Sequence, residues 1–362
     1  MAKKKRFPAI LAAPAKINLF LKVRGKSPDG EKHELFSLMA RLSLADTVVL
    51  DYKPAVFFPV LTDGPDLLTP RLPAGELPDP GFFGENNLCV KALAAYRKKT
   101  RFPRFPLEIT LKKRVPAKSG LGGGSSDGAA VLKLLNRLSP EPLSAEALAD
   151  MAFGLGADMP FFLGGDDVKV PREDDPEGDD PEGDDPEDDD PEARGDDPKE
   201  PREPSEPGPG ERGRPFVRVL ADAGKKFFPF SGELPGPFVL LAKPPGGLST
   251  KAVFEAYREL AGPVPKKPRP FRPDRASGFS GKNFPAIGEN DLAPAILKLS
   301  PETGELHRAL GEVAAGAPRG VTGSGTACFA LFATARESGE ARARLLKAAG
   351  ADRWWTEEAC FV

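Results

Sequence analysis

The chain has 362 residues, with 51 Lys and Arg, 53 Asp and Glu, and a formal net charge of −2. Hydrophobic residues make up 40% of the sequence, and no apolar run approaches the roughly 18 residues needed to span a bilayer, which argues against a membrane protein. The three scattered cysteines are too few for a disulfide framework or a zinc site, so a reducing, cytoplasmic location is predicted. The length predicts a sizeable core in two domains.

The N-terminus combines a basic start with an apolar stretch, as a signal peptide does. Pro8 and Pro14 interrupt that stretch, which leads directly into Lys16, so export is not expected. From Lys16 to Val23 apolar and polar residues alternate, which predicts a strand with one buried face. A lysine in such a strand is usually an outward-facing, solvated charge.

The next predicted element is a helix over 86–96, for which an Asn is a suitable cap. It is followed by a strand, a glycine-rich loop and a second helix. Residues 107–112 alternate as a half-buried strand, and residues 129–138 form a strong helical pattern with Ser125, Ser126 or Asp127 available as its cap. Between them lies Gly120-Leu121-Gly122-Gly123-Gly124-Ser125-Ser126-Asp127. Glycines allow backbone amides to approach an anion, and a helix N-terminus adds unpaired N–H groups, so this loop predicts phosphate binding.

The glycine spacing excludes two common nucleotide motifs. No lysine follows these glycines as a Walker A loop requires, and the third glycine of a dinucleotide fingerprint would fall on Ser125. Gly25-Lys26-Ser27 has Phe20 where a Walker loop has its first glycine. The protein-kinase catalytic signatures are absent as well.

Further along the chain, an amphipathic helix over 144–155 precedes Asp158, which also has the sequence context of a helix N-cap before Pro160. Residues 237–243 predict a buried strand, and Thr250 is predicted to cap a helix over 251–260. Residues 321–332 form a second glycine-rich loop that leads into a strand. A helix over 337–349 and a strand over 354–362 complete the chain.

Acidic residues are concentrated in one segment. Between Asp166 and Arg212 there are 22 acidic and 6 basic residues, which leaves 31 acidic and 45 basic residues in the rest of the chain. Pro/Gly/acid repeats with almost no apolar side chains cannot offset their ordering entropy, so residues 166–215 are predicted to be a disordered insertion. A solvated linker is the favoured interpretation, and the alternative is a polyanion that lies against the basic remainder and competes with nucleotide.

The basic remainder suits polyanionic small molecules such as nucleotides. Charge alone does not distinguish these from nucleic acid, but no recognised nucleic-acid-binding module accompanies it. We therefore predict small-molecule partners and no nucleic-acid partner. The oligomeric state is not predicted.

Several motifs together resemble the galactokinase, homoserine kinase, mevalonate kinase and phosphomevalonate kinase (GHMP) superfamily. They are Pro14-Ala15-Lys16-Ile17-Asn18-Leu19, the loop from Pro116 to Asp127, Gly156-Ala157-Asp158-Met159-Pro160-Phe161-Phe162-Leu163, Glu289-Asn290-Asp291-Leu292 and Val321-Thr322-Gly323-Ser324-Gly325-Thr326. Within the superfamily the chain is most similar to the 4-diphosphocytidyl-2-C-methyl-D-erythritol kinase family of the non-mevalonate isoprenoid pathway. This resemblance covers about 300 residues, all but the acidic insertion and a few loops.

The resemblance implies an α+β, two-domain GHMP kinase fold. An N-terminal domain over 1–165 would carry the glycine loop, and a ferredoxin-like C-terminal domain over 216–362 would close the active site. The implied reaction transfers the γ-phosphoryl group of ATP, with Mg²⁺, to the 2-hydroxyl of 4-diphosphocytidyl-2-C-methyl-D-erythritol, a cytidine-diphosphate-linked polyol. The alternatives are a GHMP kinase for another small alcohol and a non-catalytic nucleotide-binding module.

The resemblance also implies roles for individual residues. Asp158 would be the general base, Lys16 would stabilise the transferred phosphoryl group, and Asn18 would orient the acceptor. On the cytidyl side, His33 would hydrogen-bond the base, Phe254 would stack on it, and Thr250 would lie at the substrate. Lys32 stands where the family has a tyrosine that packs on cytosine, and it is a candidate contact for the substrate diphosphate.

The implied ATP-binding residues form one continuous stretch. Ser125 and Ser126 are the candidates for contact with phosphate oxygens or Mg²⁺, but the metal ligands themselves are not predicted. The full set of cofactor-binding residues is Pro116, Ala117, Lys118, Ser119, Gly120, Leu121, Gly122, Gly123, Gly124, Ser125 and Ser126.

Overall fold

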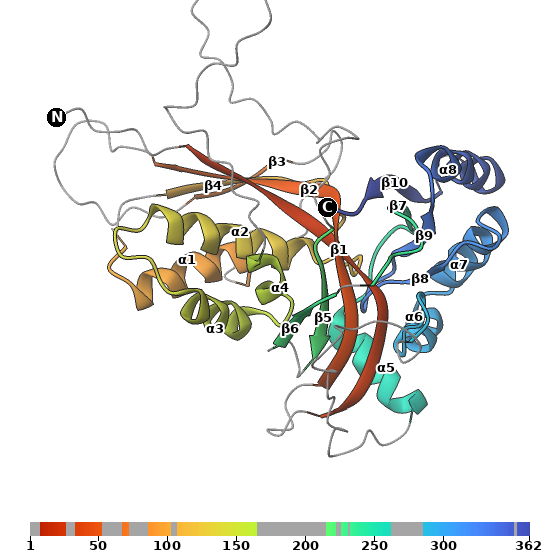
Figure 1. Ribbon diagram of the computed structural model, residues 1–362, viewed down its shortest axis with the longest axis horizontal. Coiled ribbons are helices and arrows are strands. Elements are labelled where there is room, and N and C mark those ends of the chain that lie inside the picture. Colours follow the sequence, from red (N-terminus) through yellow and green to blue (C-terminus); the bar gives the residue numbers. More distant parts are fainter. Residues whose placement is uncertain are drawn as a thin grey trace, which may run out of the picture.

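The computed structural model describes residues 8–26, 33–52, 67–71, 86–102, 107–164, 215–221, 226–230, 232–261, 285–350 and 353–362. Within these ranges the chain forms two β-sheets, each accompanied by its own helices (Figure 1). Two predictions concern residues outside these ranges: the role of Lys32 and the disorder of residues 166–214. None of the helices that the structure describes is long and apolar enough to cross a membrane.

The first sheet has the strand order β3-β4-β2-β5-β6, with β1 paired to β2. Its strands are β1 (Ala9–Lys26), β2 (His33–Tyr52), β3 (Leu67–Arg71), β4 (Leu107–Lys112), β5 (Val217–Ala221) and β6 (Lys226–Pro229). The pairing of β3 with β4 is parallel and the others are antiparallel. β5 and β6 follow the predicted boundary at residue 216 and yet extend this sheet, so the division into 1–165, 166–215 and 216–362 remains a prediction.

Strand β1 is buried on both faces, whereas the sequence predicted one buried face. Every side chain from Ala15 to Leu21 is buried. Ile17 and Leu19 pack with Val239 and Phe329 of the second sheet, while the opposite face of β1 meets helix α2 (Gly123–Leu138). The alternation of polar residues was therefore misleading, because Lys16 and Asn18 face an internal site and not solvent.

Four helices cover one face of the first sheet, as Figure 1 shows for α1, α2, α3 and α4. The three not yet defined are α1 (Leu88–Lys99), α3 (Ala145–Leu155) and α4 (Met159–Leu163). The core between them joins Leu50 and Ile109 of the sheet to Val131 and Leu135 of α2. The Asn87 side chain accepts a hydrogen bond from the Cys89 amide at 2.8 Å, so an asparagine caps α1 as predicted.

The second sheet is antiparallel with the strand order β10-β7-β9-β8. Its strands are β7 (Phe238–Lys243), β8 (Arg319–Val321), β9 (Cys328–Phe332) and β10 (Trp355–Cys360), and its helices are α5 (Thr250–Ala261), α6 (Ala293–Leu299), α7 (Pro301–Val313) and α8 (Ala335–Ala349). The chain order of strand, helical segment, two strands, helix and strand, with this strand arrangement, is ferredoxin-like. The predicted C-terminal architecture is confirmed.

Two predicted helix N-caps were wrong. Helix α2 begins at Gly123, inside the glycine loop, and its N-cap position is Gly122 without a side-chain cap, so Ser125, Ser126 and Asp127 lie within the helix. Helix α5 begins at Thr250, and the Ser249 hydroxyl accepts the hydrogen bond from the Ala252 amide at 3.2 Å. Strand β3 lies in a proline- and glycine-rich stretch of the sequence.

Candidate active site

Two glycine-rich loops, one from each sheet, meet at the centre of the molecule. The Ala327 amide donates to the Ser119 carbonyl at 3.0 Å, and the Lys16 amide donates to the Leu121 carbonyl at 2.8 Å. Gly120 has a φ of +84°, and a β-carbon on it would collide with the Thr322 carbonyl oxygen. The loops therefore pack backbone against backbone, which requires residues without side chains.

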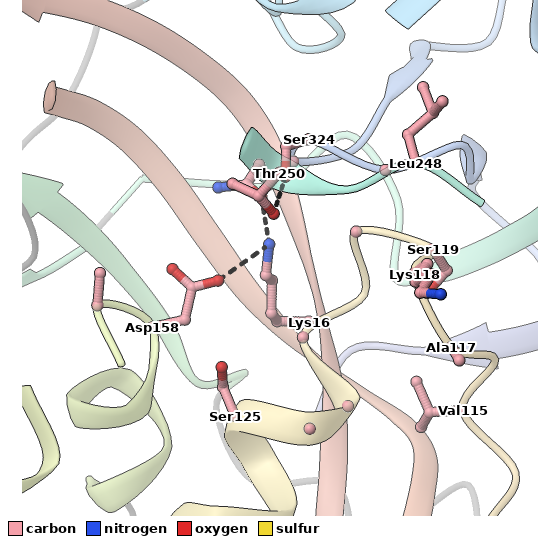
Figure 2. A pocket seen from close by; sticks show the side chains of 18 of the residues that line it. Lys16, Val115, Ala117, Lys118, Ser119, Ser125, Asp158, Leu248, Thr250 and Ser324 are labelled. Atoms are coloured by element: carbon pink, nitrogen blue, oxygen red, sulfur yellow. Dashed lines mark hydrogen bonds and ion pairs between the residues drawn. The ribbon is translucent and has the colours of Figure 1, made fainter. Parts of the chain in front are cut away.

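Lys16 is the charged group at this junction. Its side chain is only 4% exposed, and its Nζ lies 3.7 Å from the Asp158 carboxylate and 2.5 Å from Asn18 Oδ1 (Figure 2). Burial lowers the pKa of Lys16, and the neighbouring Asp158 raises it only in part. The Asp158 side chain is 35% exposed, so the pair joins a buried cation to a carboxylate that solvent and ligands can reach.

Asp158 occupies the N-cap position of α4, as the sequence context predicted, but its side chain makes no capping hydrogen bond. The carboxylate is instead directed to Lys16. Figure 2 shows Ser125, at the start of α2, with its hydroxyl pointing toward the same pair. An acid, a cation and a hydroxyl thus converge from α4, β1 and α2.

A buried hydrogen-bond chain fixes Asn18. Its amide Nδ2 donates to the Ser37 hydroxyl at 2.7 Å, and that hydroxyl donates to the Phe20 carbonyl at 2.5 Å. Because Nδ2 donates to Ser37, Asn18 Oδ1 is the atom turned to Lys16. The Asn18 backbone amide donates to the Thr322 hydroxyl of the second glycine loop at 2.8 Å.

Asn290 holds that second glycine loop in place. Its buried amide donates to the Val321 and Gly323 carbonyls, each at 2.9 Å, and its Oδ1 accepts from the Leu292 amide at 2.9 Å. The motif that contains Asn290 was noted in the sequence without a role. The contacts of Ser37 and Thr322 were not predicted, because only the tertiary fold brings these residues to β1.

A second buried ionic cluster underlies the start of α2. Lys113 Nζ lies 2.6 Å from Asp127 and also contacts Asp46, whose Oδ1 accepts from the Val115 amide at 2.8 Å. Burial opposes the charge of Lys113, but the two carboxylates outweigh it and raise its pKa. Burial is the main cause that raises the pKa of Asp127. Lys113 lowers this pKa and Asp46 raises it, and the net pKa is about 7. Sequence analysis treated Asp127 only as a motif residue and helix cap.

On the opposite side of Lys16 lie residues predicted to contact substrate. The His33 and Phe254 rings stack on each other, with centroids 4.5 Å apart and planes 19° apart. The Thr250 and Ser324 hydroxyls are 2.9 Å apart, which joins α5 to the second glycine loop (Figure 2). Because the two rings are in direct contact, no base can lie between them in this structure. A base that stacks between them would first have to separate the rings.

Lys16, Asp158 and Ser125, the Lys113–Asp127 pair, the His33–Phe254 rings and the Thr250–Ser324 hydroxyls all border one cavity of about 850 Å³. The predicted site residues that line it are Lys16, Asn18, His33, Pro116, Ala117, Lys118, Ser119, Gly120, Gly122, Gly123, Gly124, Ser125, Asp158, Thr250 and Phe254. Leu121 and Ser126, also predicted to bind ATP, are buried and do not line it. Lys113, Asn87 and Leu88 extend its wall beyond the predicted set.

A glycine loop at a helix N-terminus, closed by a second glycine loop from a ferredoxin-like sheet, is the arrangement of the GHMP class of kinases. Residues 87–168 match the family of GHMP kinases N terminal domain. A solved homoserine kinase from Cytophaga hutchinsonii has the same fold, with a TM-score of 0.55 at 14% identity over 100% of this chain and 96% of that one.

Similarity to one branch of this class is much higher. The chain is 31% identical over 336 residues to the 4-diphosphocytidyl-2-C-methyl-D-erythritol kinase of Carboxydothermus hydrogenoformans, covering 91% of each chain. It is 33% identical to that of Paracoccus denitrificans, covering 95% of this chain and 93% of the relative. A crystal structure of 4-(cytidine 5'-diphospho)-2C-methyl-D-erythritol kinase superimposes with a TM-score of 0.59 at 26% identity, covering 98% and 100% of the two chains.

The chain therefore belongs to the 4-diphosphocytidyl-2-C-methyl-D-erythritol kinase family. Membership confirms the family, the α+β two-domain fold and the ATP-dependent kinase class that the motifs predicted. The roles of individual site residues and the use of Mg²⁺ stay predictions.

Proposed function

We propose that the protein transfers the γ-phosphoryl group of ATP to the 2-hydroxyl of 4-diphosphocytidyl-2-C-methyl-D-erythritol. The observation that carries the proposal is the Lys16–Asp158 pair, 3.7 Å apart, which faces the cavity beside the glycine loop. Relatives at 31–33% identity carry the name of this kinase. The family therefore favours the cytidyl substrate over another small alcohol, and the acid–cation pair argues against a module that only binds nucleotide.

The glycine loop is the proposed phosphate site. The first residues of α2 line the cavity, where unpaired backbone N–H groups and the partial positive charge of a helix N-terminus favour an anion. Gly124 has open space where a side chain would project, since a β-carbon on it would meet nothing within 4 Å. Phosphate oxygens have room at that position, and Lys118 and Ser119 border the same cavity.

Asp158 is the proposed general base. It accepts the proton of the 2-hydroxyl as that oxygen forms its bond to the γ-phosphorus, and the bond from this phosphorus to the bridging oxygen of ADP breaks. A positioned base contributes about 10²–10⁴-fold to such a rate. Lys16 provides a desolvated positive charge at the developing phosphoryl charge, and Asn18 keeps the Lys16 ammonium directed at the site.

The residues at the cavity also fit Mg²⁺, which prefers oxygen ligands and usually keeps several waters. Ser125 and Asp158 supply a hydroxyl and a carboxylate at the cavity wall. In the described part of the chain, no three His, Cys, Asp or Glu side chains group as a metal site. We therefore infer that Mg²⁺ would bind mainly through the phosphates with Ser125, where it would neutralise charge on the transferred group.

His33, Phe254 and Thr250 are the proposed substrate residues. Once the two rings separate, Phe254 offers a flat apolar surface for a pyrimidine base and His33 a ring nitrogen for a hydrogen bond, and base–aromatic stacking contributes roughly 1–3 kcal/mol per base. Thr250 presents a hydroxyl beside Ser324 at the mouth of the second glycine loop. A cytoplasmic location and the lack of a nucleic-acid partner remain predictions.

The test is release of ADP by the purified protein with Mg·ATP and the cytidyl substrate, run in parallel with mevalonate, homoserine and galactose. We expect turnover with the cytidyl compound alone and a loss of about 10²–10⁴-fold in kcat for Asp158→Asn. Turnover with a different alcohol would keep the kinase class and overturn the substrate. ATP binding with no turnover on any of the four would overturn the proposal in favour of a binding module.

A further inference from the structure

Arg41 on β2 is a cation buried deep beside the active site. The side chain is among the largest that are fully buried, with 1% of the residue exposed. Charged residues are almost never this buried unless their charge is used in specific contacts. Arg41 lies outside the motifs that identified the site.

Register places Arg41 directly across the sheet from Lys16. The two residues are Cα partners in the antiparallel pairing of β1 with β2. Side chains of such partners project from the same face of a sheet. On this face Met39, two residues before Arg41, packs with Phe161 and Phe162 of α4.

Helix α4 lies between the two cations. At its start, the Asp158 carboxylate faces Lys16. At its end, Arg41 Nη2 donates to the Phe161 carbonyl at 3.0 Å and also to the Gly164 carbonyl. The last carbonyls of a helix have no partner within it and carry partial negative charge, so a buried guanidinium with several donors satisfies them well.

The same guanidinium also holds the chain where it returns from the acidic segment. Arg41 Cζ lies 3.8 Å from the centroid of the Phe216 ring, and the Arg41 amide donates to the Phe216 carbonyl at 3.2 Å. In sequence, Gly164 and Phe216 flank residues 165–215. One side chain therefore contacts both the residue that precedes this stretch and the residue that follows it.

We propose that Arg41 is a positioning residue that holds α4, and through it Asp158, in register with Lys16. The proposal rests on the function proposed for Asp158. Helix α4 has only five residues, so few contacts of its own fix its position. Arg41 binds the end of α4 and Phe216 to β2, the strand that also pairs with β1.

The test compares three variants of the full chain in kcat, in KM for ATP and in urea unfolding. Arg41→Met retains much of the apolar stem but loses the donors, and Arg41→Lys retains the charge without the planar fork. Arg218→Met is the matched control, because Arg218 Cζ also lies 4.1 Å from the Phe216 centroid while its guanidinium donates a hydrogen bond to the Val217 carbonyl of β5.

We expect Arg41→Met to lower kcat at least tenfold with KM for ATP within twofold of the parent, Arg41→Lys to recover part of the loss, and Arg218→Met to stay within twofold in both. A folded Arg41→Met protein that unfolds at lower urea but keeps its kcat would overturn the proposal, because only a structural role would remain. If Arg41→Met does not fold, Arg41→Lys is the deciding variant. A lower kcat with an unchanged KM for ATP supports the proposal, and an unchanged kcat overturns it.

Amide hydrogen exchange separates this proposal from the proposed function. We expect the amides of Met159 and residues 161–164 to exchange at least tenfold faster in the Arg41 variants than in Arg218→Met, whether or not the parent turns over the cytidyl substrate. An inactive parent with this exchange difference would overturn the reaction and retain the role of Arg41 in holding α4. Equal exchange in the Arg41 and Arg218 variants would overturn the role of Arg41.

Discussion

Gly325 lies against Gly120 so closely that a β-carbon on Gly325 would collide with the Gly120 amide nitrogen and the Ser119 carbonyl carbon. The two glycine loops are therefore not separate phosphate-binding features. Each forms the wall against which the other is held, and the Ala327–Ser119 hydrogen bond joins them at 3.0 Å. Displacement of one loop changes the shape of the whole cavity.

Replacement of Gly325 by alanine should force the loops apart. Overpacking of a close contact costs about 1–3 kcal/mol of the free energy of unfolding, and we expect KM for ATP to rise at the same time. Urea unfolding and steady-state kinetics measure the two effects. The control is Gly154→Ala in α3, where a β-carbon meets nothing within 4 Å and helix propensity should stabilise by about 0.5–1 kcal/mol. An unchanged KM in Gly325→Ala would contradict the packing argument.

The pH dependence of activity should report the buried state of Lys16. Because burial lowers its pKa below 10.5, the cation is lost at a lower pH than in an exposed lysine, and kcat should fall as pH rises through the lowered value. Between the lowered pKa of folded Lys16 and its ordinary pKa of 10.5, the unfolded chain holds a proton on Lys16 that the folded chain has released. The contribution of Lys16 to the free energy of unfolding therefore rises with pH in this range. Activity and stability should therefore change in opposite directions.

Profiles of kcat and of urea unfolding between pH 7 and 10 check this expectation. Lys16→Arg is the comparison, since arginine stays charged throughout this range. Its residual activity should lack the alkaline decrease. A decrease of the same midpoint in Lys16→Arg would assign the titration to another group.

Removal of Lys113 should strongly destabilise the protein, because it leaves the Asp46 and Asp127 carboxylates buried together. Breaking a buried ion pair in this way costs about 3–5 kcal/mol. We expect that loss in the urea unfolding of Lys113→Met and partial recovery in Lys113→Met combined with Asp127→Asn. Lys112→Met, at a half-buried neighbouring position, should stay within about 0.5 kcal/mol. Equal losses in the single and double variants would show that the carboxylates do not repel each other.

Loss of the Asn290 side chain should loosen the second glycine loop. Asn290→Ala leaves the buried Val321 and Gly323 carbonyls without their donor, which costs about 1–3 kcal/mol and should raise KM for ATP. Thr334→Ala is the control, since it removes the capping box of α8 for about 1 kcal/mol and is remote from the cavity. A similar KM in both variants would mean that the loop does not depend on Asn290.

The convergence of the glycine loop, Lys16 and Asp158 was predictable because each lies in a short local motif. The partners that fix them were not, because they depend on long-range pairing. Thr322 contacts Asn18 across 304 residues of sequence. Ser37 has no local signal of its own, and Arg41 resembles an ordinary surface residue, since burial of arginine is rare.

The start of α2 shows the same limit on a local scale. Glycine and serine are weak helix formers, so their propensities placed the helix start after the loop. In the fold, packing of Gly123 against Val115 and burial of Ser126 and Asp127 outweigh propensity. Helical geometry therefore begins inside the phosphate loop itself.

The double burial of β1 has a consequence for how this chain can change in length. Side chains alternate along a strand, so deletion of one residue between Ala15 and Leu21 would turn Lys16 or Asn18 toward the second sheet and an apolar neighbour toward the cavity. Between Gly164 and Phe216, by contrast, the chain accommodates 51 residues. A change in length is thus costly along the strand that carries Lys16, which can accept substitution but not deletion.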